Sequence, residues 1–308
     1  MRMTRLLLVG VLLLGQMGCS EVTGLEEQGR NRKMIGDYSR VLSTSQDPDE
    51  LLNTALLLCQ TRPQPGYGEI LTHLQQEEFL DRLDSKEEYL EAPKKLRLWR
   101  ILEALQTSPD ADAHQVLKTL TQTEAFTKDA SRIELLIEAG SAVRPAPPEV
   151  IQFWDVHCQP SDGYLHITME AILENGTPPA MALFERKMMD PRFSNEDKIA
   201  WMLSSVLMHR NQVELLQSCR RLLNGSLAGP LRATLVDALF DYKPQEWFTP
   251  ATALTPEYRG KASTEALVLL RDLGQMALGM SELNPSQKAA VQKTLVEVEA
   301  ILVSRKKS

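Results

Sequence analysis

The chain has 308 residues, with 34 Lys and Arg against 41 Asp and Glu, so its formal net charge is −7. An acidic balance excludes a general electrostatic attraction to nucleic acid, and we expect no nucleic-acid partner. Aromatic residues make up only 6% of the chain and there are 16 glycines, a composition that favours an all-α fold over a β-rich one.

The first 18 residues have the pattern of a signal peptide. Arg2 and Arg5 form a basic start, and Leu6–Leu14 is a nine-residue apolar run with one glycine. This run is too short to span a bilayer, so we predict a targeting segment over residues 1–18 that is removed. Its loss would take the net charge to −9.

The sequence Gly15-Gln-Met-Gly-Cys19-Ser20 follows the apolar run. It resembles a bacterial lipoprotein signal, although Gln16 and Met17 depart from the usual pattern. The resemblance implies lipidation of Cys19, an extracytoplasmic location and a membrane anchor through the N-terminal lipid. In a host with two membranes, Ser20 implies delivery to the outer membrane or its periplasmic face. Ordinary secretion, with cleavage after Ser20, is the alternative.

Residues 19–30 are polar and predict a flexible tether. A weak helix is expected over Arg32–Leu42. A stronger one opens at Pro48, with acidic residues in its first turn, and stops before the Pro- and Gly-rich stretch 63–68. Further helical segments are expected over residues 69–80, 85–91 and 93–106.

A short pattern of apolar, polar and small residues recurs along the chain. The steps between its copies are 35, 32, 34 and 33 residues. The small residue suits close packing of two helices, and the polar residue faces outward. The copies are Ile101–Leu105, Leu136–Gly140, Thr168–Ile172, Met202–Val206 and Leu235–Leu239.

Another helical segment precedes each of the last four copies, and these segments are Asp110–Leu120, Pro148–His157, Pro178–Met189 and Gln212–Leu223. One helix pair cannot bury its apolar face alone, so successive pairs are expected to stack. We expect Asn175-Gly176 and Asn224-Gly225 to end helices in the left-handed conformation.

The last copy is similar to a HEAT-type repeat, because Leu231-Arg232 is followed by Ala238-Leu239. Asp190-Pro191 resembles the turn of that family, and the resemblance covers about residues 92–243. It implies an all-α fold, a right-handed alpha-solenoid of stacked helix pairs, within one helical-repeat domain over residues 31–308. HEAT units of about 40–47 residues are longer than the observed step, which is nearer the tetratricopeptide length of about 34. A tetratricopeptide-like array and an irregular bundle therefore stay open, although the tetratricopeptide signature is absent.

Residues 243–261 interrupt this regularity with three prolines and three aromatic residues, and Tyr242 stands just before them. Such a long stretch without a helical pattern is often functional, and aromatic side chains make good contact anchors. We predict Trp247, Phe248 and Tyr258 as candidate partner contacts. The alternative is that Trp247 and Phe248 fill the last groove of the stack. Helices over residues 263–305 are expected to cap the array.

The sequence lacks the standard motifs of hydrolases, phosphate-binding loops and zinc sites. The densest set of possible metal ligands matches no zinc spacing and comprises Asp155, His157, Cys158, Asp162 and His166. We therefore expect no catalytic residue, no metal and no cofactor. The three remaining cysteines, Cys59, Cys158 and Cys219, are expected to be buried free thiols, with a Cys158–Cys219 disulfide as the alternative.

These features together predict a lipid-anchored, extracytoplasmic helical-repeat scaffold that binds a protein partner. A structural component of an envelope assembly is one alternative. An enzyme that uses the helical array as a frame, with its chemistry near residues 155–166 or in the 243–261 stretch, is another.

Overall fold

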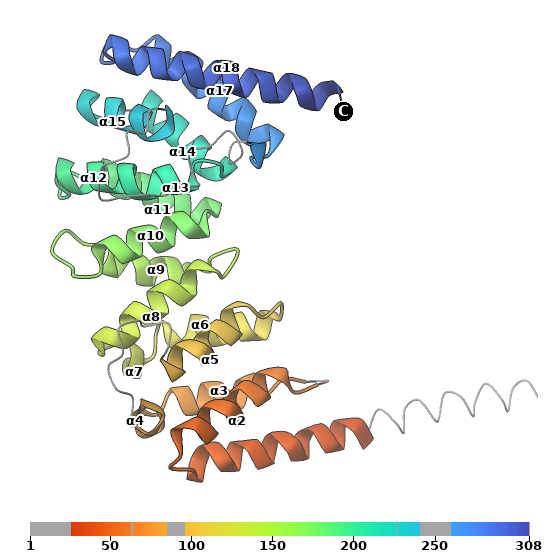
Figure 1. The fold of residues 1–308 in the computed structure, drawn as a ribbon. Coiled ribbons are helices and arrows are strands. Elements are labelled where there is room, and N and C mark those ends of the chain that lie inside the picture. The colour runs from red at the N-terminus through yellow and green to blue at the C-terminus, as the bar shows by residue number, and fades with distance from the viewer. Residues whose placement is uncertain (1–25, 63, 85–95, 226, 241–259, 308) are drawn as a thin grey trace, which may run out of the picture. The chain divides into compact units, whose positions relative to one another are not determined.

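The computed structural model describes residues 26–62, 64–84, 96–225, 227–240 and 260–307. These residues form helices joined by turns and loops and contain no strand, which confirms the predicted all-α class (Figure 1). The chain divides into two compact units, Met1–Leu136 and Ile137–Ser308.

The described part of unit 1 begins with a helix over residues 26–44 and continues through short helices that pack on one another. The Asp47 side chain accepts a hydrogen bond from the Asp49 backbone N–H, and Pro48 occupies the first turn of α2, as helix starts favour. Helix α2 packs against α3, α4 and α5, and α6 packs against α3 and α5. The elements are α2 (Pro48–Gln60), α3 (Tyr67–Leu74), α4 (Glu77–Asp84), α5 (Arg97–Gln106), α6 (Ala111–Leu120), α7 (Glu124–Thr127) and the start of α8 (Ala130–Ser141).

The single helix expected over residues 69–80 is wrong, because the structure divides it into α3 and α4. The chain turns at Gln75 and Gln76, and Glu77 and Glu78 form the acidic first turn of the new helix. After the break, α4 buries an apolar face of its own, which includes Phe79 and Leu80. The predicted segment 85–91 lies outside the described residues.

Unit 2 contains the helices that follow, arranged in chain order (Figure 1). Helix α11 packs against α9, α10 and α14, and α14 packs against α17. In the same way α12 packs against α10 and α15, and α15 packs against α18. The elements are α9 (Pro148–His157), α10 (Leu165–Asn175), α11 (Pro178–Met189), α12 (Asn195–Trp201), the π-helix η2 (Met202–Val206), α13 (Leu207–His209), α14 (Val213–Asn224), α15 (Gly229–Phe240), α17 (Thr264–Leu278) and α18 (Pro285–Lys307).

All five copies of the recurring pattern lie in helices, namely α5, α8, α10, η2 and α15. Their polar third residues are exposed or half-buried, as predicted. Their small fourth residues are half-buried at Ala104 and buried at Ala139, Ala171, Ser205 and Ala238. A small side chain at a buried helix position leaves room for a neighbouring helix to come close.

The two Asn-Gly helix ends differ. Gly176 has φ of 64°, in the left-handed region predicted for it, and caps α10 by donating its N–H to Ile172. The left-handed prediction at Asn224-Gly225 is wrong, because Gly225 has φ of −91° and ψ of −156°. Gly225 is extended, so the chain leaves α14 without the left-handed reversal.

Helices α17 and α18 pack closely along their length. Gly274 permits this approach, because a Cβ at that position would lie 2.7 Å from Leu295 Cδ2. Among the helices that the structure describes, none is both long and apolar enough to cross a membrane.

Candidate functional site

The predicted site residues lie outside the described part of the chain. This applies to the signal segment, to Cys19 and to the candidate partner contacts Trp247, Phe248 and Tyr258. Their roles therefore remain predictions. The described residues instead contain polar clusters between helices.

Polar contacts join residues of unit 2 that are about one repeat step apart. Asn175 Nδ2 donates to the carbonyls of Ser141 and Val143, 34 and 32 residues earlier. Ser218 Oγ donates to Glu185, 33 residues earlier, at 2.6 Å. These separations are close to the step of the recurring sequence pattern.

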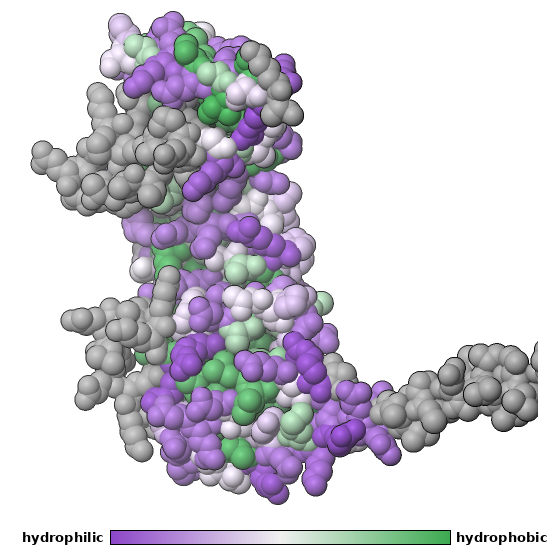
Figure 2. Space-filling model, turned by 45° about the vertical axis from the view of Figure 1, so that its right-hand side comes forward, coloured by the Kyte–Doolittle hydropathy of each residue, from purple (hydrophilic) through white to green (hydrophobic). Residues whose placement is uncertain are grey.

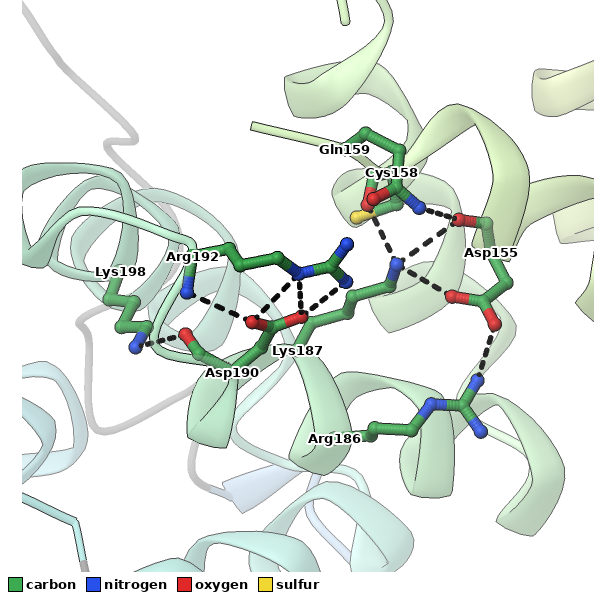
Figure 3. Close-up of polar contacts among 8 residues, drawn as sticks. All are labelled: Asp155, Cys158, Gln159, Arg186, Lys187, Asp190, Arg192 and Lys198. Carbon is green, nitrogen blue, oxygen red and sulfur yellow. Dashed lines mark hydrogen bonds and ion pairs between the residues drawn. The ribbon is translucent and has the colours of Figure 1, made fainter. Parts of the chain in front are cut away.

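A larger cluster centres on Lys187, whose side chain is 2% exposed. Its ammonium extends from α11 to the end of α9 (Figure 3). It lies 2.6 Å from Asp155 Oδ1 and donates to the carbonyls of Cys158 at 2.7 Å and Asp155 at 3.1 Å. The ammonium also lies 5.6 Å from the centre of the Phe193 ring. Because an ammonium has three N–H donors, these contacts use its hydrogen-bonding capacity. The geometry is that of a helix-joining ion pair and leaves no free amine for nucleophilic chemistry.

Asp155 also binds a second cation on the outer side of the cluster. Its Oδ2 accepts from Arg186 Nη2 at 2.9 Å, and the Arg186 side chain is 60% exposed. Asp155 is thus shared between a buried lysine and an exposed arginine. Lys187 and Arg186 can therefore be substituted one at a time, while the Asp155 carboxylate that both contact is kept.

The turn after α11 is held by a further polar group. The Arg192 guanidinium donates to both carboxylate oxygens of Asp190, and these hydrogen bonds lower the Asp190 pKa to about 2. Lys198, from α12, donates to the Asp190 backbone carbonyl at 2.8 Å (Figure 3). Burial lowers the Lys198 pKa, which Asp190 partly opposes. These contacts fix the connection between α11 and α12.

The candidate metal ligands do not form a metal site. Asp155 faces Lys187 and Arg186, and the Cys158 carbonyl accepts from Lys187. His157 Nδ1 lies 3.6 Å from Asp162 Oδ2, beyond hydrogen-bonding distance, and burial lowers the His157 pKa against the effect of Asp162. Within the described ranges, no group of three His, Cys, Asp or Glu side chains is arranged to hold a metal ion.

Unit 1 holds a cluster that the sequence did not reveal. Ser39 Oγ donates to Glu69 Oε2 at 2.8 Å and lies 3.5 Å from His73 Nε2. Burial lowers the His73 pKa, so the neutral imidazole is favoured. In a hydrolase triad the histidine stands between serine and carboxylate, whereas here the serine hydroxyl donates directly to the carboxylate. The cluster therefore joins the 26–44 helix to α3 and has no activated nucleophile.

The three described cysteines are buried free thiols, as predicted. Burial raises the pKa of Cys59 from 9.0 to about 11 and the pKa of Cys158 and Cys219 to about 12. The thiolate is the reactive form, so these side chains are poor nucleophiles at neutral pH.

We expect these three thiols to resist a disulfide reagent in the folded Cys19→Ser variant at pH 8 and to react fully in guanidinium chloride. Timed absorbance of the released thiolate measures both. Because folding raises the pKa, the thiols favour the folded state below pH 9, and this contribution falls as pH rises towards 12. Rapid reaction of all three at pH 8 without denaturant would contradict the burial.

A sequence signal could have located Lys187. Residues Ala180, Met181, Phe184 and Met188 have helical spacing, and position 187 falls on the same buried face. A lysine there requires a partner, which the end of α9, earlier in the chain, supplies. The Ser39 cluster has only the Glu69–His73 spacing of four residues as a local signal.

Comparison of the chain with protein-family models, with curated proteins and with solved structures gave no match. The resemblances to a lipoprotein signal and to HEAT-type repeats therefore rest on the residues of this chain alone.

Proposed function

We propose that this chain is a lipid-anchored, extracytoplasmic scaffold whose short HEAT-like helix pairs form a right-handed solenoid and bind a protein partner. Lipid on Cys19 fixes the location, and the stacked pairs supply an extended docking surface. The residues proposed to contact the partner are Trp247, Phe248 and Tyr258.

One observation carries the repeat architecture: polar contacts recur at about the repeat step. Asn175 meets Ser141, Lys187 meets Asp155 and Ser218 meets Glu185, at separations of 34, 32 and 33 residues. Helix packing supports the same spacing. Helix α11 packs against α9, two helices earlier in the chain, and against α14, later in the chain. Contacts between successive units are the means by which repeat proteins are stabilised.

The polar clusters of the described residues make structural contacts, and this supports a docking role over a catalytic one. Lys187, Asp155 and Asp190 make contacts that join helices or fix turns. The serine and histidine of unit 1 have the geometry of a packing contact. A binding role needs no activated group, only a rigid surface that positions contact residues.

Metabolic labelling tests the anchor. We expect the wild-type chain to incorporate labelled palmitate and to fractionate with membranes, and the Cys19→Ser variant to do neither. Ordinary secretion predicts an unlabelled chain in both cases. That outcome would remove the anchor from the proposal and leave the scaffold to be tested separately.

The Trp247→Ala substitution tests the docking surface. Loss of a buried aromatic anchor typically costs about 2 kcal/mol or more of binding, so we expect capture of the partner to fall more than tenfold, an order-of-magnitude figure. Val156→Ala is the control, because Val156 is 57% exposed and lies outside residues 243–261. Circular dichroism would verify folding. Unchanged capture by a folded Trp247→Ala variant would exclude this residue as a contact.

A further inference from the structure

Helix α18 has two apolar faces, and only one of them is covered by the described chain. Val291, Thr294, Val298 and Leu302 recur at helical spacing and are buried. This face packs against α15 and α17. The Thr294 hydroxyl donates to the Phe240 carbonyl at 3.3 Å, which fixes the rotation of α18 against α15.

The opposite face of α18 exposes Ala289, Val296, Ala300 and Val303. Val296 is 71% exposed, the largest value among the exposed large apolar side chains of the described residues, and Val303 is 48% exposed. They are seven residues apart, so they lie on one side of the helix two turns from each other. Figure 2 shows hydrophobic side chains at the surface of this end of unit 2. These exposed apolar side chains lie on a face of α18 that the described helices leave uncovered, and such a face suits contact with another apolar surface.

The sequence of this face is symmetric about Val296. Ala289 stands seven residues before Val296 and Val303 seven residues after it, while Lys293 and Glu299 stand three residues before and after it. In an antiparallel helix pair with its two-fold axis at Val296, residues at equal distances from the axis lie level with each other. Val296 then meets its own copy, Ala289 lies level with Val303, and each Lys293 lies level with the other copy's Glu299. The opposite charges and the apolar positions are therefore both complementary.

We propose that α18 pairs with α18 of a second copy of this chain, antiparallel and with the two-fold axis at Val296. Such an isologous contact is the commonest form of protein self-association. Glu299 is 50% exposed and lies 3.8 Å from Arg271, so it can reach the second copy's Lys293 without loss of a close internal ion pair. The pairing joins two chains at their α18 ends.

This inference is independent of the proposed docking function and needs no lipid. One helix from each copy gives a small interface, and interfaces below about 1,200 Å² are typical of weak or transient complexes. The experiment must therefore trap the pair. The described cysteines are buried, so in the Cys19→Ser background a new exposed thiol can be oxidised selectively.

Disulfide trapping of the full-length chain in mild detergent tests the contact. The Val296→Cys variant, oxidised with copper phenanthroline, is expected to give a strong band at twice the monomer mass on a non-reducing gel. Val156→Cys is the matched control, because Val156 is similarly exposed but lies on α9. A Val296→Cys variant that yields no more dimer than Val156→Cys would overturn the pairing, whatever the result of partner capture.

Charge reversal tests the orientation. In the Val296→Cys background, Lys293→Glu or Glu299→Lys places like charges level with each other and should lower the trapped fraction several-fold. The double substitution restores opposite charges and should recover most of the dimer. A folded double variant that stays as low as the single ones would overturn the antiparallel register.

Discussion

Replacement of Lys187 by alanine is expected to lower the free energy of unfolding by about 2–4 kcal/mol, because it removes the ammonium that donates to the Cys158 carbonyl and opens a cavity. The ammonium is the shared donor to the carbonyls of Asp155 and Cys158. Its loss also removes the contact with the Phe193 ring. Urea unfolding followed by circular dichroism measures the change.

Arg186→Ala is the matched control for this prediction. Arg186 binds the same Asp155 carboxylate, but its side chain is 60% exposed, whereas Lys187 is 2% exposed. Exposed ion pairs contribute less than about 1 kcal/mol, so we expect a correspondingly small loss. Equal effects of the two substitutions would mean that charge near Asp155, and not burial of Lys187, stabilises this part of unit 2.

Trp154→Ala is expected to cost about 3–5 kcal/mol, the usual range for truncation of a large buried aromatic side chain. Trp154 is 0% exposed, and its indole Nε1 donates to the Ile137 carbonyl at 3.3 Å. The ring also packs against Gly140, where a Cβ would come within 3.1 Å of Trp154 Cζ2. The substitution therefore removes both the packing and the hydrogen bond between α9 and the Ile137–Ser141 part of α8.

Val156→Ala, on the same helix, is the control for Trp154→Ala. Val156 is 57% exposed, and surface substitutions usually change stability by less than about 0.5 kcal/mol. Chemical unfolding of both variants measures the difference. If Trp154→Ala cost no more than Val156→Ala, the packing of α8 against α9 would contribute little to unit 2.

The helices of unit 2 could be predicted well because their ends carry local signals. The predicted Pro148–His157 and Pro178–Met189 agree with α9 and α11 residue for residue. Proline fixes the first turn of each, and apolar residues recur at helical spacing behind it. The recurring pattern also located buried positions, since Ala139 and Ala238 are buried where the pattern repeats.

Other features depend on tertiary contacts that no local pattern records. The break between α3 and α4 satisfies the packing of two short helices against α2, whereas the local sequence is compatible with one helix. Gly225 is extended although Asn-Gly usually favours a left-handed turn. The Lys187 cluster joins residues 29–32 positions apart, so its partners were invisible until the helices were placed. The predicted partner contacts Trp247, Phe248 and Tyr258 lie outside the described residues and remain predictions.

The most direct test of the proposed docking role is crosslinking in intact host cells, with a C-terminal tag on the wild-type chain and on the Cys19→Ser variant. Detergent extraction, tag capture and mass spectrometry would then identify crosslinked proteins. The scaffold proposal predicts one reproducible protein partner for the wild-type chain and loss of that partner when Cys19 is replaced. A wild-type chain that reaches the membrane and yields no partner would contradict the proposal and favour a structural or catalytic role.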